Sequence, residues 1–370
     1  MAEAKKELID PYLDWVAAEK VPVHTGIAVD LLTVETRPWP RFGYDGAIIH
    51  LEARGDFVTL FLADLPPGCA SIPTKHMYEQ LVYVLSGHGS AKLEAPDGRE
   101  VAFEWGPHSL FAIPLNMRYR LFNGSGRERA RLALCNTFPL VYNYFMNERF
   151  VFDCPSTFPD RLGASEWFEG DGKEVAFDRG PTLWETNFVP DVSSFRLKPL
   201  ASRGPGSSNI QFILGNGVMK AHVSAMPVGT YKKCHRHGPD FFIFNVTGSG
   251  YSLMWQEDAE DHVRVDWRHG IIFTPPDMWW HQHFNTSAEP ARYLAMNLGN
   301  RKHPFTAERK TAAKVIGVSQ KDGGRQIEYE DQAPWVHKLY LEELARHGAK
   351  CRMSEFMDES VLLRKIAATA

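Results

Sequence analysis

Hydrophobic and polar positions alternate over short stretches of the 370-residue chain, and turn-forming residues separate these stretches. Segments such as "DFVTLFLADLPPG" and "EQLVYVLSGHGSAKL" are rich in β-branched and aromatic residues and end near glycine, proline or charged residues. This pattern predicts short strands joined by tight turns. Apolar residues with helical spacing occur at the two ends, at 5–19 and 335–348, and Gly348 is the expected end of the second helix. The pattern therefore predicts a strand-rich middle flanked by short helices.

The middle of the chain contains an internal repeat. Gly87 follows Gly68 by 19 positions, as Gly248 follows Gly229, and Asn123 follows Pro114 by nine positions, as Asn285 follows Pro276. The interval from the second glycine to the proline is 27 residues in the first unit and 28 in the second. Three matched intervals in the same order indicate a duplicated domain. Each unit is rich in strands and in Gly/Pro turns, which is typical of a small antiparallel barrel or jelly roll.

Both units resemble the two motifs of the cupin superfamily. The second unit reads "GTYKKCHRHGPDFFIFNVTG" and "PDMWWHQHFN", and the first reads "GCASIPTKHMYEQLVYVLSG" and "PLNMRYRLFN". The resemblance covers residues 45–140 and 205–300. It implies an all-β fold of two tandem cupin barrels, which are double-stranded β-helix jelly rolls, with short helical segments at the N- and C-termini. We expect a helical or extended arm at 1–44, a linker at 141–204 and a C-terminal helical segment at 301–370.

Histidines separated by one residue mark the second unit. Residues i and i+2 of a strand point to one face, so His235 and His237 can aim two imidazoles at one ion. His281 stands at the third-ligand position of the cupin motif, and imidazoles suit Fe, Mn, Ni, Cu and Zn. The family's usual glutamate position holds Phe241, which cannot ligate, and the neighbouring Asp240 would point to the other face. The sequence therefore predicts a three-histidine centre with open positions, as a catalytic metal needs.

The first unit lacks this set of ligands. Its corresponding positions are Thr74, His76, Gln80 and Tyr119, and Glu79 is one step out of register. Only one of the four positions is a histidine. We therefore expect a degenerate N-terminal barrel that is kept for structure, dimerisation or lid formation.

A three-histidine cupin without the glutamate resembles the gentisate and salicylate dioxygenases, whose second motif has the form of "FTPPDMWWHQHFN". The resemblance implies a non-haem Fe(II) dioxygenase that cleaves a small hydroxylated or aminated aromatic acid, or a related chelating substrate, with O2. Mn, Ni and Zn are the alternative metals. In those dioxygenases the metal lies in the N-terminal cupin, whereas the intact motif here is C-terminal. For this reason gentisate itself is not assigned as the substrate.

Alternation extends the candidate site beyond the three ligands. His283 shares the face of the third ligand and is the candidate general acid or base. If the first ligand strand extends backwards, Tyr231 and Lys233 face inward, and Lys233 can pair with a substrate carboxylate. Trp280 is a candidate wall of the substrate pocket. The glycine-rich stretch at 202–209 lacks the context of a phosphate loop and is interpreted as the linker into the second barrel.

Two other classes of function stay open. One is a metal-dependent isomerase, hydrolase or decarboxylase that uses Mn, Zn or Ni. Oxalate decarboxylases are bicupins, but they use three histidines and a glutamate, and Phe241 argues against that chemistry. The other is a non-catalytic bicupin that binds a small molecule. Oxygen uptake by the Fe(II)-loaded protein separates the dioxygenase from both, and metal content separates the enzymes from the binding module.

Composition and charge narrow the range of partners. Hydrophobic residues make up 44% and charged residues 23%, as in ordinary globular proteins, and the net charge of −4 carries no nucleic-acid signal. Five scattered cysteines without a C-x-x-C pair fit a reducing compartment. The charged N-terminus lacks the apolar stretch of a secretory signal, and no apolar run approaches the ~18 residues of a membrane span. We expect a cytoplasmic homo-oligomer, a dimer or tetramer, that meets a small substrate and O2 but neither nucleic acid nor membrane.

Overall fold

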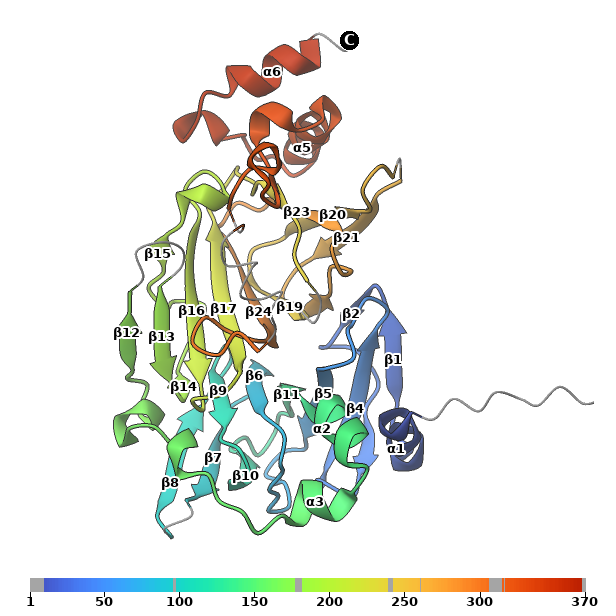
Figure 1. The fold of residues 1–370 in the computed structure, drawn as a ribbon, viewed down its shortest axis with the longest axis vertical. Coiled ribbons are helices and arrows are strands. Elements are labelled where there is room, and N and C mark those ends of the chain that lie inside the picture. The colour runs from blue at the N-terminus through green and yellow to red at the C-terminus, as the bar shows by residue number, and fades with distance from the viewer. Residues whose placement is uncertain are drawn as a thin grey trace, which may run out of the picture.

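The computed structural model describes residues 10–95, 98–176, 182–238, 242–259, 261–305, 315 and 317–367. Figure 1 shows two strand-rich bodies along the long axis of the molecule, the N-terminal one below and the C-terminal one above. Helices α5 (Pro334–Arg346) and α6 (Ser360–Ala367) lie at the top of the upper body, and α1 (Pro11–Glu19), α2 (Phe138–Phe145) and α3 (Glu148–Asp153) lie at the side, front and bottom of the lower one (Figure 1). The predicted fold class, two tandem cupin barrels with short helical segments, is confirmed.

The N-terminal barrel consists of two sheets. Its strands are β1 (Val23–Gly26), β3 (Arg37–Trp39), β4 (Tyr44–Leu51), β5 (Thr59–Leu65), β6 (Gln80–Ser86), β7 (Gly89–Glu94), β8 (Glu100–Trp105), β9 (Leu110–Ile113), β10 (Arg118–Asn123), β11 (Ala130–Asn136) and β14 (Phe188–Val189). The larger sheet has the order β1-β4-β5-β11-β6-β9-β14, with β3 paired to β4, and the smaller one has the order β10-β7-β8.

The C-terminal barrel repeats this plan. Its strands are β2 (Ala28–Asp30), β12 (Lys173–Val175), β13 (Leu183–Thr186), β15 (Lys198–Pro199), β16 (Ser208–Leu214), β17 (Met219–Met226), β18 (Cys234–His235), β19 (Phe242–Thr247), β20 (Gly250–Trp255), β21 (Val263–Trp267), β22 (Ile271–Phe273), β23 (Trp280–Asn285), β24 (Ala291–Leu298) and β25 (Gln326–Ile327). The larger sheet has the order β12-β13-β16-β17-β24-β19-β22-β2, with β15 paired to β16, and the smaller one has the order β21-β20-β23-β18-β25.

The two barrels exchange strands at their junction. Strand β2 comes from the N-terminal arm but pairs with β22 of the C-terminal barrel, and β14 follows the first barrel's helices but pairs with β9. The outer faces of the two larger sheets share one hydrophobic cluster. Members of this cluster from both barrels include Ile49, Leu60, Leu62, Tyr83, Ile210, Phe212, Val223, Phe244 and Leu294. Burial of this shared surface joins the barrels into one core.

The repeat is visible in matching hydrogen bonds. Asn123 at the end of β10 donates to the carbonyls of Leu65, Pro66 and Glu128. Asn285 at the end of β23 donates in the same way to the carbonyls of Met226, Pro227 and Glu289. Gly89 and Gly250 stand opposite these asparagines, and a Cβ on either would lie 1.9 Å from a backbone oxygen. The matched asparagines and glycines are therefore required by the same backbone geometry.

Helices cover the ends of the molecule. The α-helices are α1 (Pro11–Glu19), α2 (Phe138–Phe145), α3 (Glu148–Asp153), α5 (Pro334–Arg346) and α6 (Ser360–Ala367). Short 3-10 turns are η1 (Pro159–Arg161), η2 (Ser165–Phe168), η3 (Ala201–Arg203), η4 (Gln320–Asp322), η5 (Tyr329–Asp331) and η6 (Met353–Glu355). Helices α1 and α5 occupy the two predicted helical segments, and Gly348 adopts a left-handed φ of +65° just after α5. None of the helices in the described ranges is both long and apolar enough to cross a membrane.

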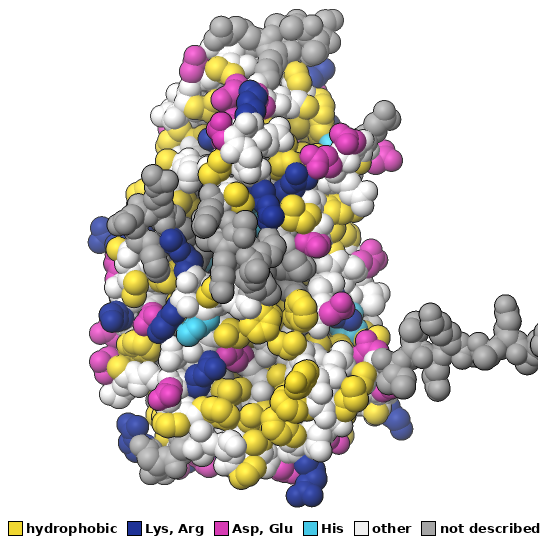
Figure 2. Space-filling model, in the orientation of Figure 1, with side chains coloured by type: hydrophobic (Ala, Val, Ile, Leu, Met, Phe, Trp, Pro, Cys, Tyr) yellow, Lys and Arg dark blue, Asp and Glu magenta, His cyan; other side chains and the backbone are white. Residues whose placement is uncertain are grey.

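One face of the N-terminal barrel is notably apolar. Figure 2 shows hydrophobic side chains gathered on the lower part of the molecule, over α2 and α3. Tyr144, Phe145 and Met146 at the end of α2 are among the exposed large hydrophobic residues. Patches of this kind mark interaction surfaces more often than scattered apolar residues do.

Candidate metal centre

Three imidazoles converge in the C-terminal barrel. His235 on β18 is the direct register partner of His281 on β23, and His237 follows β18 by two residues. The ring centroids lie 4.4 Å apart for His235 and His281 and 4.6 Å apart for His237 and His281. One ring nitrogen from each residue lies within 4.8 Å of the other two. The structure thus brings together the three residues that the sequence predicts as metal ligands.

Backbone carbonyls fix which nitrogen of each ring carries the proton. The Nδ1 atoms lie 3.1 Å from the carbonyl oxygen of Lys233 for His235, 3.1 Å from that of Gly238 for His237, and 3.0 Å from that of Trp279 for His281. A carbonyl can only accept, so each Nδ1 donates and each neutral ring keeps a lone pair on Nε2. The Nε2 of His281 is buried and has no hydrogen-bond partner among the described residues. Ligating histidines are held in this way, so the three side chains fit a divalent metal ion.

Burial keeps His235 and His281 neutral. Burial, with a smaller contribution from the positive charge of Arg203, lowers the pKa of His281 to about 4. Burial also lowers the pKa of His235 well below its ordinary value, with Arg203 and the neighbouring imidazoles adding to the effect. Because an imidazole must be deprotonated to bind a metal, both rings are ready to ligate at neutral pH.

His283 lies beside the ligands but is held differently. Its Nδ1 is 2.7 Å from Oγ of Ser252, and that oxygen accepts a 3.0 Å hydrogen bond from the indole nitrogen of Trp267. Since the indole can only donate, the hydroxyl hydrogen of Ser252 is available for Nδ1 of His283. This arrangement favours a proton on Nε2 of His283, the opposite tautomer from that of the three ligands. In this tautomer His283 is a hydrogen-bond donor at the site, and it lies outside the group of three converging ring nitrogens.

Two cations lie close to these histidines. Lys232 is buried, donates to the hydroxyl of Tyr293 at 3.1 Å, and has its ammonium group 4.7 Å from the centre of the same ring. Burial lowers the pKa of Lys232 below its ordinary value, and it lowers the pKa of the half-buried Arg203 to about 10, so Arg203 remains charged at neutral pH. Burial alone would raise the pKa of Tyr293, but the charges of Lys232 and Arg203 bring it below its ordinary value.

Neither cation is paired with a carboxylate in the described part of the chain. Among the described residues, the ion pairs of this region involve other side chains, such as Lys233 with Glu328 and Arg236 with Glu257. A buried cation without a counter-charge is costly unless a ligand supplies that charge. The interior of this barrel is therefore suited to an anion next to the metal ligands.

Each of the three residues predicted to contact substrate has a partner within the protein. Tyr231 belongs to the hydrophobic cluster under α5, where its hydroxyl is 3.2 Å from Nδ1 of His337. Lys233 forms an ion pair with Glu328. Trp280 stacks against the guanidinium of Arg236 at 4.3 Å, and it alternates with His281 along β23. The structure does not bring these side chains onto the three imidazoles, and substrate contact through them stays a prediction.

Lys232 and Arg203 could not be selected by strand alternation. Counting every second residue backwards from His235 selects Lys233. However, β18 begins at Cys234, so Lys233 lies outside the strand and the alternation does not extend to it. Arg203 lies in the glycine-rich stretch interpreted as a linker. There Gly204 has a φ of +139°, and a Cβ would lie 3.1 Å from Cα of Lys232. This close approach by glycine brings the Arg203 backbone against the ligand strand, where its carbonyl accepts from the Lys233 amide at 3.1 Å.

Two residues that carried weight in the sequence argument are Asp240 and Phe241. Both lie outside the described residues. The inference drawn from the missing glutamate at Phe241 therefore stays a prediction.

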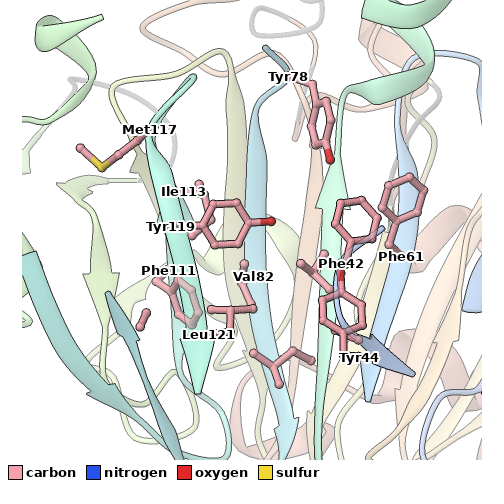
Figure 3. Packing of buried hydrophobic residues seen from close by; sticks show 14 of the residues in the cluster. Phe42, Tyr44, Phe61, Tyr78, Val82, Phe111, Ile113, Met117, Tyr119 and Leu121 are labelled. Atoms are coloured by element: carbon pink, nitrogen blue, oxygen red, sulfur yellow. The ribbon is translucent and has the colours of Figure 1, made fainter. Parts of the chain in front are cut away.

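The N-terminal barrel places different side chains in the same register. Thr74 pairs with Tyr119, as His235 pairs with His281. His76 stacks on Tyr78 with ring centroids 3.8 Å apart, and Gln80 donates to the Tyr119 hydroxyl at 3.3 Å. Figure 3 shows the rings of Phe42, Tyr44, Phe61, Tyr78 and Tyr119 inside this barrel. No group of metal-binding side chains that includes His76 is found in the described ranges.

The paired ligand positions and the paired asparagines decide the architecture. The fold is that of a bicupin. No protein-family model matches this bicupin, and no curated protein matches it. A single-residue variant of Bacillus subtilis oxalate decarboxylase is 12% identical, with 75% of this chain and 78% of that chain covered and a TM-score of 0.47. A structure of the same enzyme concerned with its Mn(II) centres gives the same identity, coverage and TM-score.

The prediction of a ring-cleaving dioxygenase is wrong in the light of these comparisons. The similar solved structures described above are of oxalate decarboxylase, which is not a ring-cleaving enzyme. The physical reason for the error lies in the motif that suggested it. The "WHQH" stretch specifies one metal ligand and one neighbouring hydrogen-bond donor, and many metal-dependent reactions use this pair. Trp280, which the same stretch predicted as a wall of the substrate pocket, stacks on Arg236.

Proposed function

We propose that the C-terminal barrel binds one divalent transition metal through His235, His237 and His281 and acts on a small carboxylic acid as a metal-dependent lyase. The observation that carries this proposal is the combination of three Nε2 lone pairs with two cations that have no carboxylate partner among the described residues. The reaction that fits best is a decarboxylation without net consumption of O2, one of the alternatives left open by the sequence.

Charge supports an anionic substrate. Three neutral ligands leave a divalent ion with its full charge, and Lys232 and Arg203 add two further positive charges in a region shielded from water. Electrostatic attraction is stronger there than in bulk water because the effective dielectric constant is lower. A carboxylate with a second oxygen donor would neutralise part of this charge on binding.

The residues of the chain have separate tasks in this proposal. A bound metal ion supplies Lewis acidity toward the oxygen atoms of the substrate. Lys232 and Arg203 hold a carboxylate in place by charge-assisted hydrogen bonds. Loss of CO2 leaves an electron pair on carbon that needs a proton. His283 would give its Nε2 proton and take up the hydroxyl proton of Ser252 at Nδ1, and water would reprotonate Ser252, leaving hydroxide that CO2 takes up as bicarbonate. Ser252 and Trp267 orient this ring, so the proton is available in one direction.

The donor set does not single out one metal. Imidazole nitrogens suit Mn, Fe, Ni and Zn. The affinity of a given site for divalent ions generally rises from Mn through Fe and Ni to Cu and is lower for Zn than for Cu. The proposal therefore specifies a divalent transition metal, with Mn(II), Fe(II), Ni(II) and Zn(II) as candidates.

The experiment follows product and oxygen together. Metal-free protein is reloaded anaerobically with each of the four ions and given a panel of small mono- and dicarboxylic acids. We expect metal-dependent CO2 release, detected by trapping and by NMR of the remaining product, without stoichiometric O2 uptake. Stoichiometric O2 uptake would contradict the lyase proposal. Failure to bind any ion at His235, His237 and His281 would favour a non-catalytic binding protein.

A further inference from the structure

A second group of metal-binding side chains lies on the C-terminal helices, outside the barrel interior. His337 is on α5, Cys351 lies between α5 and η6, and Glu359 immediately precedes α6. One donor atom from each residue lies within 4.8 Å of the other two. These residues are 14 and eight positions apart and form no sequence motif. Only the folding of the C-terminal segment brings them together.

The donor atoms already face one another. Oε1 of Glu359 is 3.2 Å from Nε2 of His337 and 2.9 Å from Sγ of Cys351. The His337 side chain is fully buried. Its Nε2 nevertheless has no hydrogen bond of acceptable geometry among the described residues. A buried ring nitrogen that points at a thiol and a carboxylate without a good hydrogen bond is what a metal ligand looks like before the ion binds.

The other side of the imidazole is supported by the barrel. Nδ1 of His337 is 3.2 Å from the hydroxyl of Tyr231, and that hydroxyl accepts a 2.9 Å hydrogen bond from Gln332. Burial raises the pKa of Tyr231, so the phenol stays neutral. A neutral hydroxyl can accept from Nδ1 and leave the Nε2 lone pair for an ion, which is how neighbouring groups orient ligating histidines.

We propose that His337, Cys351 and Glu359 form a second metal site, for Zn²⁺, that joins α5, the Cys351 loop and the start of α6 on the outside of the C-terminal barrel. Nitrogen, sulfur and carboxylate oxygen are the donors that zinc uses, and separations of this size need only small side-chain rotations to reach a tetrahedral ion. Cys351 and Glu359 are partly exposed, so water can enter and occupy a fourth position.

Binding requires one proton to leave. Without an ion, burial and the Glu359 carboxylate raise the pKa of the Cys351 thiol to about 12. On binding, the S–H bond breaks, sulfur bonds to zinc, and the proton goes to water. No oxidant or reductant takes part. The thiolate distinguishes this site from the three-histidine centre, because thiolate favours zinc over manganese.

The expected role is structural. Helix α5 covers the outer face of the sheet that contains β23, and Tyr340 donates to the carbonyls of Thr230 and Asn285. Phe284, which follows His283 in β23, lies in the same hydrophobic cluster as Tyr231 and Tyr340. An ion shared by α5, the Cys351 loop and the start of α6 would hold these segments together against the sheet. The inference does not depend on the proposed reaction.

The test uses the full chain carrying His281→Ala, so that the three-histidine centre is disabled. Metal-free protein is titrated with Co²⁺, which reports thiolate ligation by a charge-transfer band in the near ultraviolet, and then with Zn²⁺. We expect about one ion per chain and a thiolate–cobalt band, both lost when Cys351→Ser is added. Cys154→Ser removes another buried cysteine and is the matched control that should keep both signals.

Glu359→Gln separates ligation from folding. It keeps the size of the side chain and can still accept a hydrogen bond from Cys351, but it weakens the bond to zinc, so we expect Zn²⁺ affinity to fall by more than about tenfold. The thermal midpoint without metal should change little in this variant. A His281→Ala chain without a thiolate–cobalt band, or a band that persists in Cys351→Ser, would show that His337, Cys351 and Glu359 are only a hydrogen-bonded cluster.

Discussion

The two barrels share a backbone plan but differ in what fills them. In the N-terminal barrel Thr74 faces Tyr119, whereas in the C-terminal barrel His235 faces His281 in the same register. The first interior is packed with aromatic rings (Figure 3), and the second holds imidazoles and a buried lysine. The shared strand register therefore determines only which residue positions face one another inside the barrel. The side chains at a few of them decide between a hydrophobic core and a metal centre.

The way in which histidine is held shows the difference at one residue. His76 lies face to face with Tyr78 at an interplanar angle of 1°, and its Nδ1 donates to the carbonyl of that tyrosine. In the C-terminal barrel the rings of His235 and His281 meet at 61°, and their unprotonated nitrogens share one space. The interior histidine of the N-terminal barrel is therefore a core residue, whereas the rings of the C-terminal barrel are arranged as a metal ion would require.

The largest expected effect comes from comparing the removal of one interior histidine in each barrel. His281→Ala should abolish both metal content and turnover, because it removes one of three ligands. His76→Ala should leave both unchanged per folded molecule. Metal analysis and initial rates at a temperature where both variants are folded test this. Equal loss in the two variants would overturn the assignment of the metal to the C-terminal barrel.

His283→Gln is expected to have the next largest effect. The amide preserves a polar group but cannot transfer a proton, so kcat should fall about 10²- to 10⁴-fold while metal content stays the same. Ser252→Ala, which only removes the orienting hydroxyl, should have a smaller effect. If His283→Gln lost its metal as well, the residue would have to be counted among the ligands.

Two adjacent lysines provide a matched pair for the anion site. Lys232→Met should lower kcat/KM about tenfold to a hundredfold, since a buried charge-assisted hydrogen bond contributes about 1.5–3 kcal/mol. Lys233→Met should change kcat/KM little, because Lys233 is already paired with Glu328. Steady-state kinetics with the same acid substrate decide between them. A larger effect at Lys233 would restore the assignment made from the sequence.

The smallest expected effect concerns acid stability and isolates the N-terminal barrel. Burial lowers the pKa of His76 from 6.5 to about 4, so the unfolded chain binds this proton more readily than the folded chain does. The folded state therefore loses stability as the pH falls from 6.5 toward 4. Between pH 7 and 5 the metal-free wild type should lose about 2 kcal/mol more than His76→Gln in urea unfolding. Identical losses would place His76 in contact with solvent.

Features that depend on residues close together in the chain could be predicted from the sequence. Paired histidines with one residue between them, together with matched glycine, proline and asparagine spacings, predict both the duplicated barrels and the three converging rings. The sequence did not predict Arg203 and Lys232 as site residues. Their positions depend on where β18 begins and on the close approach of Gly204 to Lys232. The group formed by His337, Cys351 and Glu359 has no local pattern at all. The type of reaction could not be predicted for another reason. A ligand motif indicates how a metal is bound, but not which bond of the substrate breaks.

The exchange of β2 and β14 between the barrels makes each half of the chain depend on the other. A gene cut between the two halves would yield one fragment without the partner of β9 and another without the partner of β22. Each fragment would present an unpaired sheet edge, which invites aggregation. Because each half supplies a strand to the other, the N-terminal half is needed to complete the sheet of the barrel that contains the three histidines.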